Sequence, residues 1–367
     1  MTRNDAQLFQ ELTDRLYREQ GLDSDGYRYL LTHCDEEALA CLQAKAQAVA
    51  QARFGRRIFI RGLIEVSNFC RNDCYYCGIR RSNRQLCRYR LSRDVILASC
   101  REGYRLGFRT FVLQGGEDPY LTDERVEQLV ADIRHTFPDA AITLSLGEKS
   151  GEAYERFFRA GANRYLLRHE THNADHYRQL HPAALSLDNR LRCLNDLKRI
   201  GYQVGTGIMV GSPGQTIDHL VEDLVFIQEF RPQMIGIGPF LPHHDTPFAQ
   251  QPTGSLLQTL LLLSLFRLMH PAALIPSTTA LATLSPDGRE QGIRSGANVV
   301  MPNLSPPDHR AQYALYDHKA SMGAEAAEGL ALLEKRLNAI GYTIDYGRGD
   351  FLLPSTTNEH ELPTYIG

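Results

Sequence analysis

From residue 57 to residue 301, short runs rich in β-branched and aliphatic residues alternate with longer amphipathic stretches. The short runs have the composition of buried strands, and the stretches between them place apolar residues at the spacing of one helix face. We expect eight strands, at residues 57–66, 110–114, 141–146, 164–168, 203–210, 234–240, 274–278 and 298–301. We expect helices between them, at residues 92–107, 122–136, 151–160, 186–200, 216–230, 254–270 and 286–295. This alternation predicts an α/β fold, a complete (β/α)8 barrel of the TIM type.

Two flanking regions lie outside the alternation. Residues 1–55 carry apolar residues at helical spacing, which predicts an N-terminal helical extension. The barrel is expected at residues 56–310, and residues 311–367 are expected to form a C-terminal helix and tail packed on it. Neither GxGxxG nor GxxxxGK followed by Ser or Thr opens any expected helix, which argues against a dinucleotide-binding fold and a P-loop.

Charge and apolar patterning exclude several classes of protein. The 367 residues have a net charge of −3 and no long basic run, so we expect neither nucleic acid nor a membrane as a partner. The longest apolar run, residues 255–269, is interrupted by Gln, Ser and Arg and is typical of a buried helix. The amino terminus lacks the apolar core of a signal peptide. We therefore expect a cytoplasmic protein, and a closed barrel with its own helical cap is expected to be a monomer.

Three of the eight cysteines stand close together, directly after the first expected strand: Cys70, Cys74 and Cys77. A structural zinc site takes four ligands, and no fourth cysteine stands nearby. Three thiolates on a [4Fe–4S] cluster would leave one iron open for a ligand that is not a side chain. Chance spacing and a zinc site closed by a distant histidine are the alternatives. The other cysteines are isolated, and we expect ordinary thiols there: Cys34, Cys41, Cys87, Cys100 and Cys193.

Polar or glycine-rich residues follow nearly every expected strand. These segments are SNFC, QGGEDP, SLGE, RHET, MVGSPGQT, GPFLPHHDTP, STTA and MPN. The carboxyl ends of the strands carry the functional residues in a TIM-type barrel. Eight polar ends in succession, with carboxylates and an arginine among them, indicate one large active site enclosed by the barrel. His243 and His244 lie in a proline-rich segment, which indicates turn and packing roles rather than a metal site.

The cysteine motif resembles that of the radical S-adenosylmethionine (SAM) superfamily, in which CxxxCxxC follows the first barrel strand and an aromatic residue precedes the last cysteine. The resemblance implies that the three cysteines hold a [4Fe–4S] cluster, that SAM binds the open iron, and that reductive cleavage of SAM gives a 5′-deoxyadenosyl radical. It also implies that QGGEDP and GIMVGSPGQT lie against SAM. The residues implied by these motifs to bind SAM are Tyr76, Gly115, Gly116, Glu117 and Met209.

Further motifs narrow the resemblance to the HydE family, radical SAM maturases of [FeFe]-hydrogenase. RYLLRHETHN, IGIGPFLPHHDTP, IPSTTALATLSPDGRE and GANVVMPNLSP are similar to this family, in register over about residues 55–320. The resemblance implies that Glu170 and Arg190 also contact SAM. The residues it implies for substrate binding are Gln114, Thr143, Ser145, Arg164, Arg168, Thr278, Thr279, Tyr313 and Tyr316. A guanidinium suits a substrate carboxylate. The structural alternative for either arginine is a salt bridge to Glu148 or Glu170.

The C-terminal region departs from part of this family. Some members carry an auxiliary iron–sulfur cluster on C-terminal cysteines, whereas no cysteine follows Cys193 in this chain. We therefore expect one cluster only. The same absence argues against biotin synthase and lipoyl synthase, which look similar but need a further cluster as sulfur donor.

The resemblance implies an anaerobic enzyme of H-cluster assembly, whose adenosyl radical acts on the sulfur of a cysteine-bound iron carbonyl/cyanide complex in the barrel cavity. The implied partners are this small organometallic or amino-acid-like substrate and sister hydrogenase maturases. Two alternatives stay open. A mutase like methylornithine synthase would share the fold and act on lysine. A scaffold stabilised by zinc or a cluster would use the cysteines for folding alone, although Glu117 and the paired arginines favour an enzyme.

Overall fold

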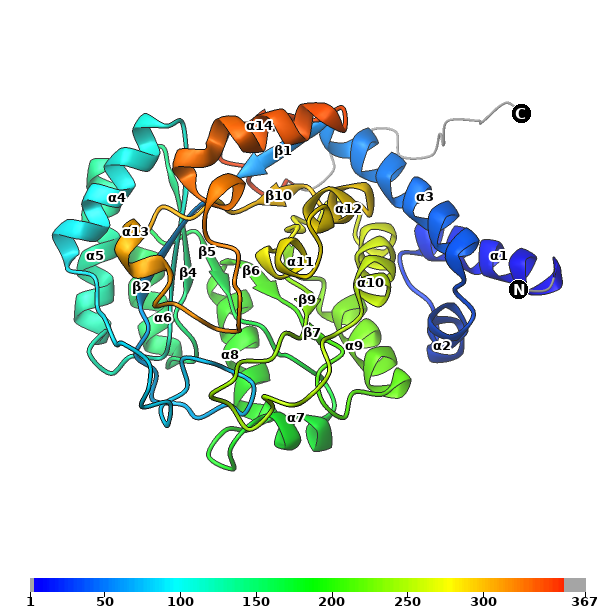
Figure 1. Cartoon of the computed structure of the whole chain (residues 1–367), viewed down its shortest axis with the longest axis horizontal. Coiled ribbons are helices and arrows are strands. Elements are labelled where there is room, and N and C mark those ends of the chain that lie inside the picture. Colours follow the sequence, from blue (N-terminus) through cyan, green and yellow to red (C-terminus); the bar gives the residue numbers. More distant parts are fainter. Residues whose placement is uncertain (1–2, 353–367) are drawn as a thin grey trace.

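The computed structural model describes residues 3–352, and its first three helices lie to one side of the central strands (Figure 1). These helices are α1 (Arg3–Glu19), α2 (Ser24–Thr32) and α3 (Glu36–Phe54). Asp23 and Asp35 begin α2 and α3 because their carboxylates accept hydrogen bonds from the backbone N–H groups of Gly26 and Ala38. Apolar residues of the three helices share one buried core with α9 (Ile217–Phe230) and α10 (Leu256–Met269).

Six parallel strands form the central sheet, in the order in which they occur along the chain. They are β2 (Gly62–Ser67), β3 (Thr110–Gly115), β4 (Ala141–Ser145), β5 (Arg164–Leu166), β6 (Gln203–Thr206) and β8 (Met234–Ile235). The connecting helices are α4 (Arg93–Arg105), α5 (Asp123–Thr136), α6 (Gly151–Ala160), α7 (Ala174–Leu180), α8 (Leu187–Ile200) and α9. Parallel neighbours joined through helices confirm the predicted α/β class. They also bring all the carboxyl ends of these strands to one side.

The strand expected at residues 57–66 is divided at Arg61 into β1 (Arg57–Ile60) and β2. The backbone N–H of Arg61 donates to the carbonyl oxygen of Val300 at 2.9 Å. The next bond of a parallel ladder would come from the N–H of residue 302, which is a proline and has none. The ladder is therefore interrupted at this point. β1 belongs to a separate sheet with β10 (Val299–Val300) and β11 (Thr343–Asp345).

Two further expected strands are each divided into two short strands. The second halves are β7 (Met209–Val210) and β9 (Gly238–Pro239), which pair with each other. A Cβ atom at Gly207 would lie 2.0 Å from the carbonyl oxygen of Gly236, so glycine is required where the two segments approach. The strand expected at residues 274–278 is present only as isolated parallel bridges, from Leu274 to Met234 and from Pro276 to Val299.

The apolar run at residues 255–269 forms α10, in which every residue from Thr259 to Met269 is buried. This confirms the prediction of a buried helix. Among the described residues, no helix is long and apolar enough to cross a membrane. The remaining helices are α11 (Thr279–Leu284), α12 (Gly288–Arg294), α13 (Pro307–Arg310) and α14 (Leu330–Ala339), with two short 3-10 turns, η1 (Gly323–Glu325) and η2 (Ala327–Gly329).

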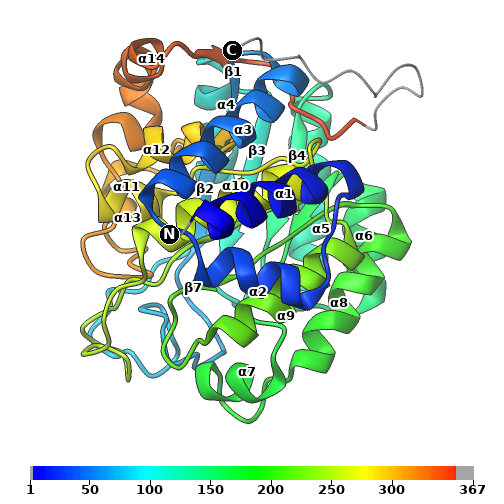
Figure 2. The same ribbon diagram turned by 90° about the vertical axis from the view of Figure 1, so that its right-hand side faces the viewer.

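The segment after β11 lies across the amino-terminal ends of the central strands. Arg164, at the start of β5, donates to the carbonyl oxygen of Gly349 (3.0 Å) and to the Asp350 carboxylate (2.7 Å). The N–H of Phe351 donates to the side chain of Gln203, at the start of β6 (3.1 Å). Figures 1 and 2 show this red segment at the end of the molecule opposite the light-blue loops that follow β2. The two ends of the sheet are thus covered by different parts of the chain.

Candidate active site

The three clustered cysteines lie on the loop that follows β2, at the carboxyl end of the sheet. Cys70, Cys74 and Cys77 are half-buried and form no disulfide. Burial, followed by the neighbouring Cys77 and Cys70, raises the pKa of Cys74 well above its usual value. Burial also raises the pKa of Cys77 to about 12. Thiols in such a setting ionise only when a cation stabilises the thiolates, which the iron ions of a cluster would do.

The number of thiols on this loop bears on the choice between a cluster and a single metal ion. A structural zinc ion takes four ligands, whereas three thiolates on a [4Fe–4S] cluster leave one iron open. The three cysteines therefore fit a cluster better than a structural zinc ion.

Within the described residues, His243, His244 and Asp317 form a group whose possible ligand atoms all lie within 4.8 Å of one another. The Nδ1 atom of His243, however, accepts a hydrogen bond from the backbone N–H of Asp245 at 3.1 Å. A neutral imidazole that accepts at Nδ1 carries its proton at Nε2, the nitrogen that faces Asp317. The turn and packing roles of the two histidines stay a prediction.

Arg88 holds the cysteine loop in shape, and the sequence did not reveal this role. Its guanidinium donates to the carbonyl oxygens of Asn68, Ile79, Arg80 and Asn83 at 2.5–3.0 Å. The planar guanidinium offers five donors, which suits several convergent carbonyls. All four acceptors are backbone carbonyl oxygens, which every residue has. The sequence therefore contains no pair of side chains from which these contacts could be predicted.

The GGE motif that follows β3 lies directly against the cysteine loop. A Cβ atom on Gly116 would lie 2.2 Å from the carbonyl oxygen of Phe69 and 2.8 Å from Cβ of Cys70. Glycine is therefore required for this approach. The structure thus brings two motifs together that are separated by about forty residues of sequence.

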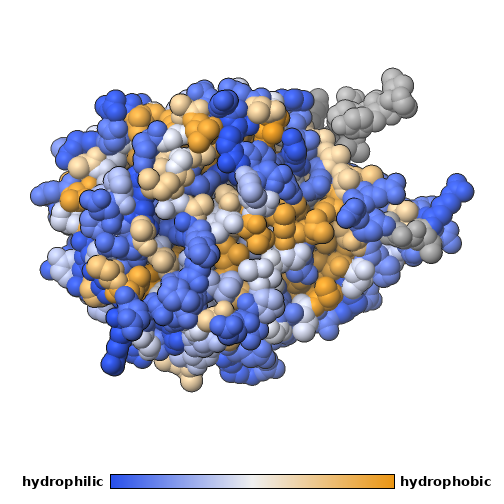
Figure 3. Space-filling model, in the orientation of Figure 1, coloured by the Kyte–Doolittle hydropathy of each residue, from blue (hydrophilic) through white to orange (hydrophobic). Residues whose placement is uncertain are grey.

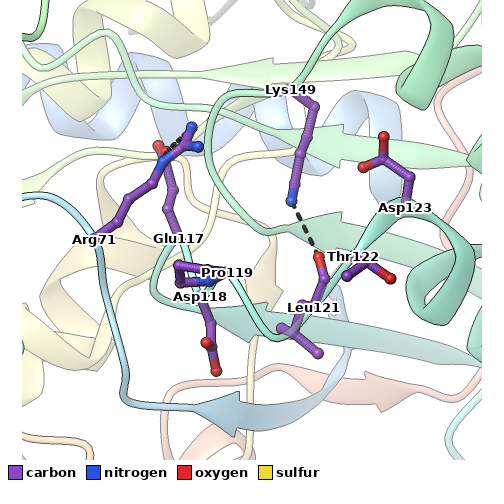
Figure 4. Close-up of a pocket in the computed structure, with 8 residues that line it drawn as sticks. All are labelled: Arg71, Glu117, Asp118, Pro119, Leu121, Thr122, Asp123 and Lys149. Carbon is purple, nitrogen blue, oxygen red and sulfur yellow. Dashed lines mark hydrogen bonds and ion pairs between the residues drawn. The ribbon is translucent and has the colours of Figure 1, made fainter.

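Glu117, the acidic residue of this motif, is buried beside the cysteine loop. Its carboxylate accepts hydrogen bonds from Nε of Arg71 (3.0 Å) and from the backbone N–H of Glu148 (2.9 Å). Figure 4 shows Arg71 and Glu117 pointing toward each other in a pocket of about 250 Å³ that Lys149 also lines. The side chain of Arg71 is 59% exposed. The carboxylate is therefore held by one backbone group and by one largely exposed side chain.

The RHET segment after β5 and the start of α8 meet at a second charged group. Nε of Arg190 donates to the Glu148 carboxylate, and Nη1 donates to the carbonyl oxygen of Arg168, both at 2.6 Å. Arg168 forms an ion pair with Glu170 at 2.9 Å, which is the alternative foreseen for this arginine. Glu170 has a φ of 67°, a conformation that costs a non-glycine residue energy and often occurs at functional sites. Glu170 and Arg190 thus lie on the same side of the site.

An apolar group completes this side of the site. Met209 shares a small buried cluster with Leu180 and Phe240, and Tyr76 packs against it. The hydroxyl group of Tyr76 lies 3.1 Å from Nε2 of His181. The structure therefore brings together two of the residues expected to contact SAM, although they stand far apart in the sequence.

Several residues expected to bind substrate present polar atoms without a partner. Among the described residues, these buried atoms include Oγ1 of Thr143, Oγ1 of Thr278 and Nε of Arg168. An unsatisfied buried polar atom costs about 1–3 kcal/mol of folding free energy. The three atoms lie on β4, at the start of α11 and after β5, and a bound ligand is one source of the missing partners.

Other expected substrate residues lie on the same strands or face them. Gln114 on β3 is paired in register with Ser145 on β4. Nε2 of Gln114 donates to the hydroxyl group of the buried Tyr313 at 3.5 Å. Thr279 begins α11, and Tyr316 is half-buried on the segment that follows α13.

The structure contradicts the expected role of Arg164. This residue is fully buried at the amino-terminal start of β5, whereas Arg168 follows the carboxyl end. Its guanidinium donates to side chains of Gln203 (3.2 Å), Thr110 (3.3 Å) and Asp350 (2.7 Å). The guanidinium is thus engaged at the opposite end of the sheet. Its partner is Asp350, not the Glu148 or Glu170 named as alternatives.

One buried charged pair was not predicted from the sequence. Glu65, fully buried on β2, forms an ion pair with Lys319 and accepts a hydrogen bond from Nδ2 of Asn303 (2.9 Å). Nζ of Lys319 also donates to the carbonyl oxygen of Tyr313 (3.1 Å). The sequence held one indication of this pair, a single carboxylate within an otherwise apolar strand. A buried carboxylate requires a partner.

Similarity to known proteins identifies the family of this chain. A model of the radical SAM superfamily matches residues 64–227. The [FeFe] hydrogenase maturase subunit HydE of Thermotoga maritima is 44% identical over 81% of this chain and 84% of that protein. The chain belongs to the HydE family of the radical SAM superfamily. It is a radical SAM enzyme, and its cofactors are a [4Fe–4S] cluster and SAM.

More distant relatives share the fold of this HydE-family chain. The 3-methylornithine synthase of Methanosarcina acetivorans is 30% identical over 87% of this chain and 89% of that protein. The crystal structure of methylornithine synthase (PylB) superposes with a TM-score of 0.80 at 28% identity, over 91% of this chain and 97% of that one. The maturase HydG superposes with a TM-score of 0.77 at 21% identity, over 94% and 77%.

Proposed function

We propose that this chain is a HydE-type maturase of [FeFe]-hydrogenase that acts on the sulfur of a cysteine-bound iron carbonyl/cyanide complex. The observation that carries the proposal is the set of three half-buried thiols on one loop, against which the GGE motif lies. The 44% identity to HydE of Thermotoga maritima supports it. When bound, the cluster and SAM supply the 5′-deoxyadenosyl radical, and the protein positions the reactants and excludes water.

The residues around the cysteine loop would hold both cofactors. Cys70, Cys74 and Cys77 would ligate the cluster. Glu117 would accept the ammonium group of SAM, because its carboxylate is buried and its partner Arg71 is exposed enough to move away. The other residues that would contact SAM are Tyr76, Gly115, Gly116, Glu170, Arg190 and Met209.

The substrate would lie where the unsatisfied polar atoms are. The hydroxyl groups of Thr143 and Thr278 and the Nε of Arg168 would gain hydrogen bonds from a ligand without losing any to the protein. Arg168 would bind a carboxylate of the amino-acid portion of the substrate. The remaining residues that would line this cavity are Gln114, Ser145, Thr279, Tyr313 and Tyr316. Arg164 has no place in this set.

A complete (β/α)8 barrel would enclose this cavity. Parallel bridges at Leu274, Pro276 and Asn303 support closure, since they link β8 to the segment before β10 and link β2 to the segment after it. Residues 56–310 would then form the barrel, with residues 1–55 and 311–367 as extensions. We further propose a cytoplasmic monomer with sister hydrogenase maturases as partners.

A second candidate is a mutase that acts on lysine, favoured by the 30% identity to 3-methylornithine synthase of Methanosarcina acetivorans. Incubation of the reduced holoenzyme with SAM and lysine, followed by mass spectrometry of the amino acids, separates the two candidates. Unchanged lysine is expected. Conversion of lysine to a branched isomer would overturn the maturase assignment and leave the radical SAM chemistry in place.

Anaerobic reconstitution tests the proposed chemistry. With iron and sulfide, the chain is expected to bind four irons and, with dithionite, to cleave SAM to 5′-deoxyadenosine. An iron count near zero with one bound zinc would contradict the proposal. Activation of [FeFe]-hydrogenase in a reconstituted maturation assay then tests the substrate, because SAM cleavage alone does not identify it.

A further inference from the structure

One acidic residue is buried on α9, a helix whose other buried residues are apolar. Figure 3 shows one face of the molecule covered largely by hydrophilic side chains, and acidic residues ordinarily belong to such a surface. Asp218, Glu222 and Glu229 of α9 are exposed in this way. Asp223 is fully buried and, among the described residues, pairs with no arginine or lysine. Because a buried carboxyl group without a cation is costly, its contacts indicate why it is there.

The carboxyl group of Asp223 contacts the RHET segment on both sides of Glu170. The backbone N–H of His172 donates to Oδ1 of Asp223 at 2.6 Å. Nε2 of His169 lies 3.3 Å from the same oxygen. His169 is fully buried, and its Nδ1 lies 2.8 Å from the hydroxyl group of Thr206 on β6. One oxygen atom of α9 therefore contacts the residue before Glu170 and the residue two positions after it.

The backbone of Glu170 is held by the neighbouring strand segments. Its N–H donates to the carbonyl oxygen of Gly207 at 3.1 Å, and its own carbonyl oxygen accepts from the N–H of Met209 at 3.4 Å. A φ of 67° at a non-glycine residue persists only where the surrounding structure enforces it. The contacts that Asp223 makes with both neighbours of Glu170 add to these bonds. The unusual conformation is therefore fixed from the strands and from α9.

Asp223 serves this segment as a hydrogen-bond acceptor and not as a charge. Burial raises the pKa of Asp223 to about 8 and lowers the pKa of His169 to about 3. Both groups are therefore mainly uncharged at neutral pH. The bond from the N–H of His172 needs an oxygen acceptor at this position. An uncharged amide of the same shape meets that need, whereas an aliphatic side chain does not.

We propose that Asp223 is a positioning residue for SAM binding, which holds the RHET segment in the conformation that presents Glu170 to SAM. This inference rests on the proposed function, in which Glu170 contacts SAM. Asp223 acts on Glu170 through the backbone of His172 and the ring of His169. Loss of the acceptor leaves the N–H of His172 without its partner and releases the segment. The binding conformation is then less populated in the free protein, and the apparent affinity for SAM falls by the same fraction.

The test measures SAM binding to the reconstituted, oxidised holoenzyme by equilibrium dialysis. Asp223→Leu removes the acceptor at similar volume and is expected to raise the dissociation constant for SAM about tenfold. Asp223→Asn keeps the acceptor and is expected to stay within about threefold of wild type. With dithionite, Asp223→Leu is expected to raise KM for SAM and to leave kcat and iron content nearly unchanged. A merely structural role would instead lower the amount of active enzyme, and so the apparent kcat, without a change in KM.

Hydrogen exchange of the peptide that covers residues 168–174 tests how the effect reaches Glu170. The amide of His172 is expected to exchange faster in Asp223→Leu than in wild type or Asp223→Asn, because its acceptor is lost. The matched control is Leu224→Ala, at the next buried position of α9, in the core shared with the N-terminal helices. This variant is expected to lower the stability of the fold and to bind SAM as wild type does.

Wild-type affinity for SAM in Asp223→Leu would overturn the proposal, and so would equal losses in the Leu and Asn variants, because the acceptor would then not be the cause. Should Asp223→Leu fail to fold, Thr206→Val takes its place, since it removes the hydroxyl group beside His169. This variant is expected to raise the dissociation constant for SAM about threefold, and an unchanged value would overturn the proposal. Failure of the wild type to bind SAM would instead overturn the proposed function.

Discussion

The two ends of the parallel strands differ in how their polar groups are satisfied. At the amino-terminal end, Arg164 is fully buried and bonded to side chains and to the backbone of the C-terminal segment. At the carboxyl end, Thr278 and Arg168 keep buried polar atoms without partners among the described residues, and so does Thr143 midway along β4. Arg61, close to Arg164 and Asp350, also keeps two guanidinium nitrogens without a partner among the described residues. Arg164 itself is thus engaged in stabilising contacts, whereas Thr278 and Arg168 leave polar atoms for a ligand. Substitutions of these residues should therefore have different effects.

The largest expected effect comes from the thiols at the carboxyl end. Cys77→Ala should remove the cluster, so iron content and SAM cleavage should fall below detection, while the free energy of unfolding of the cluster-free protein changes by no more than about 1 kcal/mol. Iron analysis, 5′-deoxyadenosine assay and urea denaturation measure these. Cys87→Ala, at an exposed cysteine, is the control and should keep its iron. A variant that no longer folds would support a purely structural role for the thiols.

Substitutions of Arg164, on β5, and of Arg168, which follows this strand, should affect different properties. Loss of Arg164 should lower stability, and loss of Arg168 should lower substrate turnover. Arg164→Ala removes a buried partner of Asp350 and should lower the free energy of unfolding by about 2–4 kcal/mol, with SAM cleavage by the folded fraction nearly unchanged. Arg168→Ala should leave stability within about 1 kcal/mol and lower substrate turnover at least tenfold. Denaturation curves and the hydrogenase activation assay measure both. The contrast fails if Arg168→Ala is the more unstable variant.

The Arg164–Asp350 pair should also give the amino-terminal end a pH dependence. Burial acts in the opposite direction, but the Arg164 guanidinium holds the pKa of Asp350 below its usual value of 3.8. An acid whose pKa is lower in the folded state adds stability above its unfolded pKa and loses it as the pH falls. The stability advantage of wild type over Asp350→Asn should therefore be constant above about pH 5 and shrink below about pH 4. Urea denaturation across pH 3–7 measures it, and a pH-independent difference would contradict the pairing.

The smallest expected effect concerns two threonines. Thr143→Val removes a hydroxyl group without a partner and should raise the free energy of unfolding by about 1 kcal/mol. Thr110→Val removes a hydroxyl group that donates to the carbonyl oxygen of Arg348 at 2.9 Å, and should lower it by about 1 kcal/mol. Urea denaturation of both variants measures the difference. Equal shifts of the same sign would show that the two hydroxyl groups are not distinguished by their hydrogen bonds.

The sequence was sufficient for the α/β class, for the buried helix α10 and for the placement of the cysteine and GGE motifs at neighbouring strand ends. These follow from local patterns and from the rule that parallel strands place their carboxyl ends together. Breaks within strands could not be predicted in the same way. The break at Arg61 depends on Pro302, and the break at Gly207 depends on the carbonyl of Gly236.

Arg164 shows most clearly where sequence reasoning failed. Arg164 and Arg168 stand four residues apart, and both were expected in the substrate cavity. The strand β5 covers only Arg164–Leu166, so Arg164 lies at its start and Arg168 lies beyond its end. The partner of Arg164 is 186 residues away in the sequence. Arg88 and Lys319 were missed for a related reason, since backbone carbonyls and a distant carboxylate are their partners.

The central claim is that the carboxyl end of the sheet holds a three-cysteine cluster with one iron open to SAM. Electron paramagnetic resonance of the reduced, reconstituted protein with and without SAM tests it most directly. A [4Fe–4S] signal whose g values shift on addition of SAM is predicted, because SAM binds the open iron. An identical signal in both samples, or the absence of a cluster signal after reconstitution, would contradict the account.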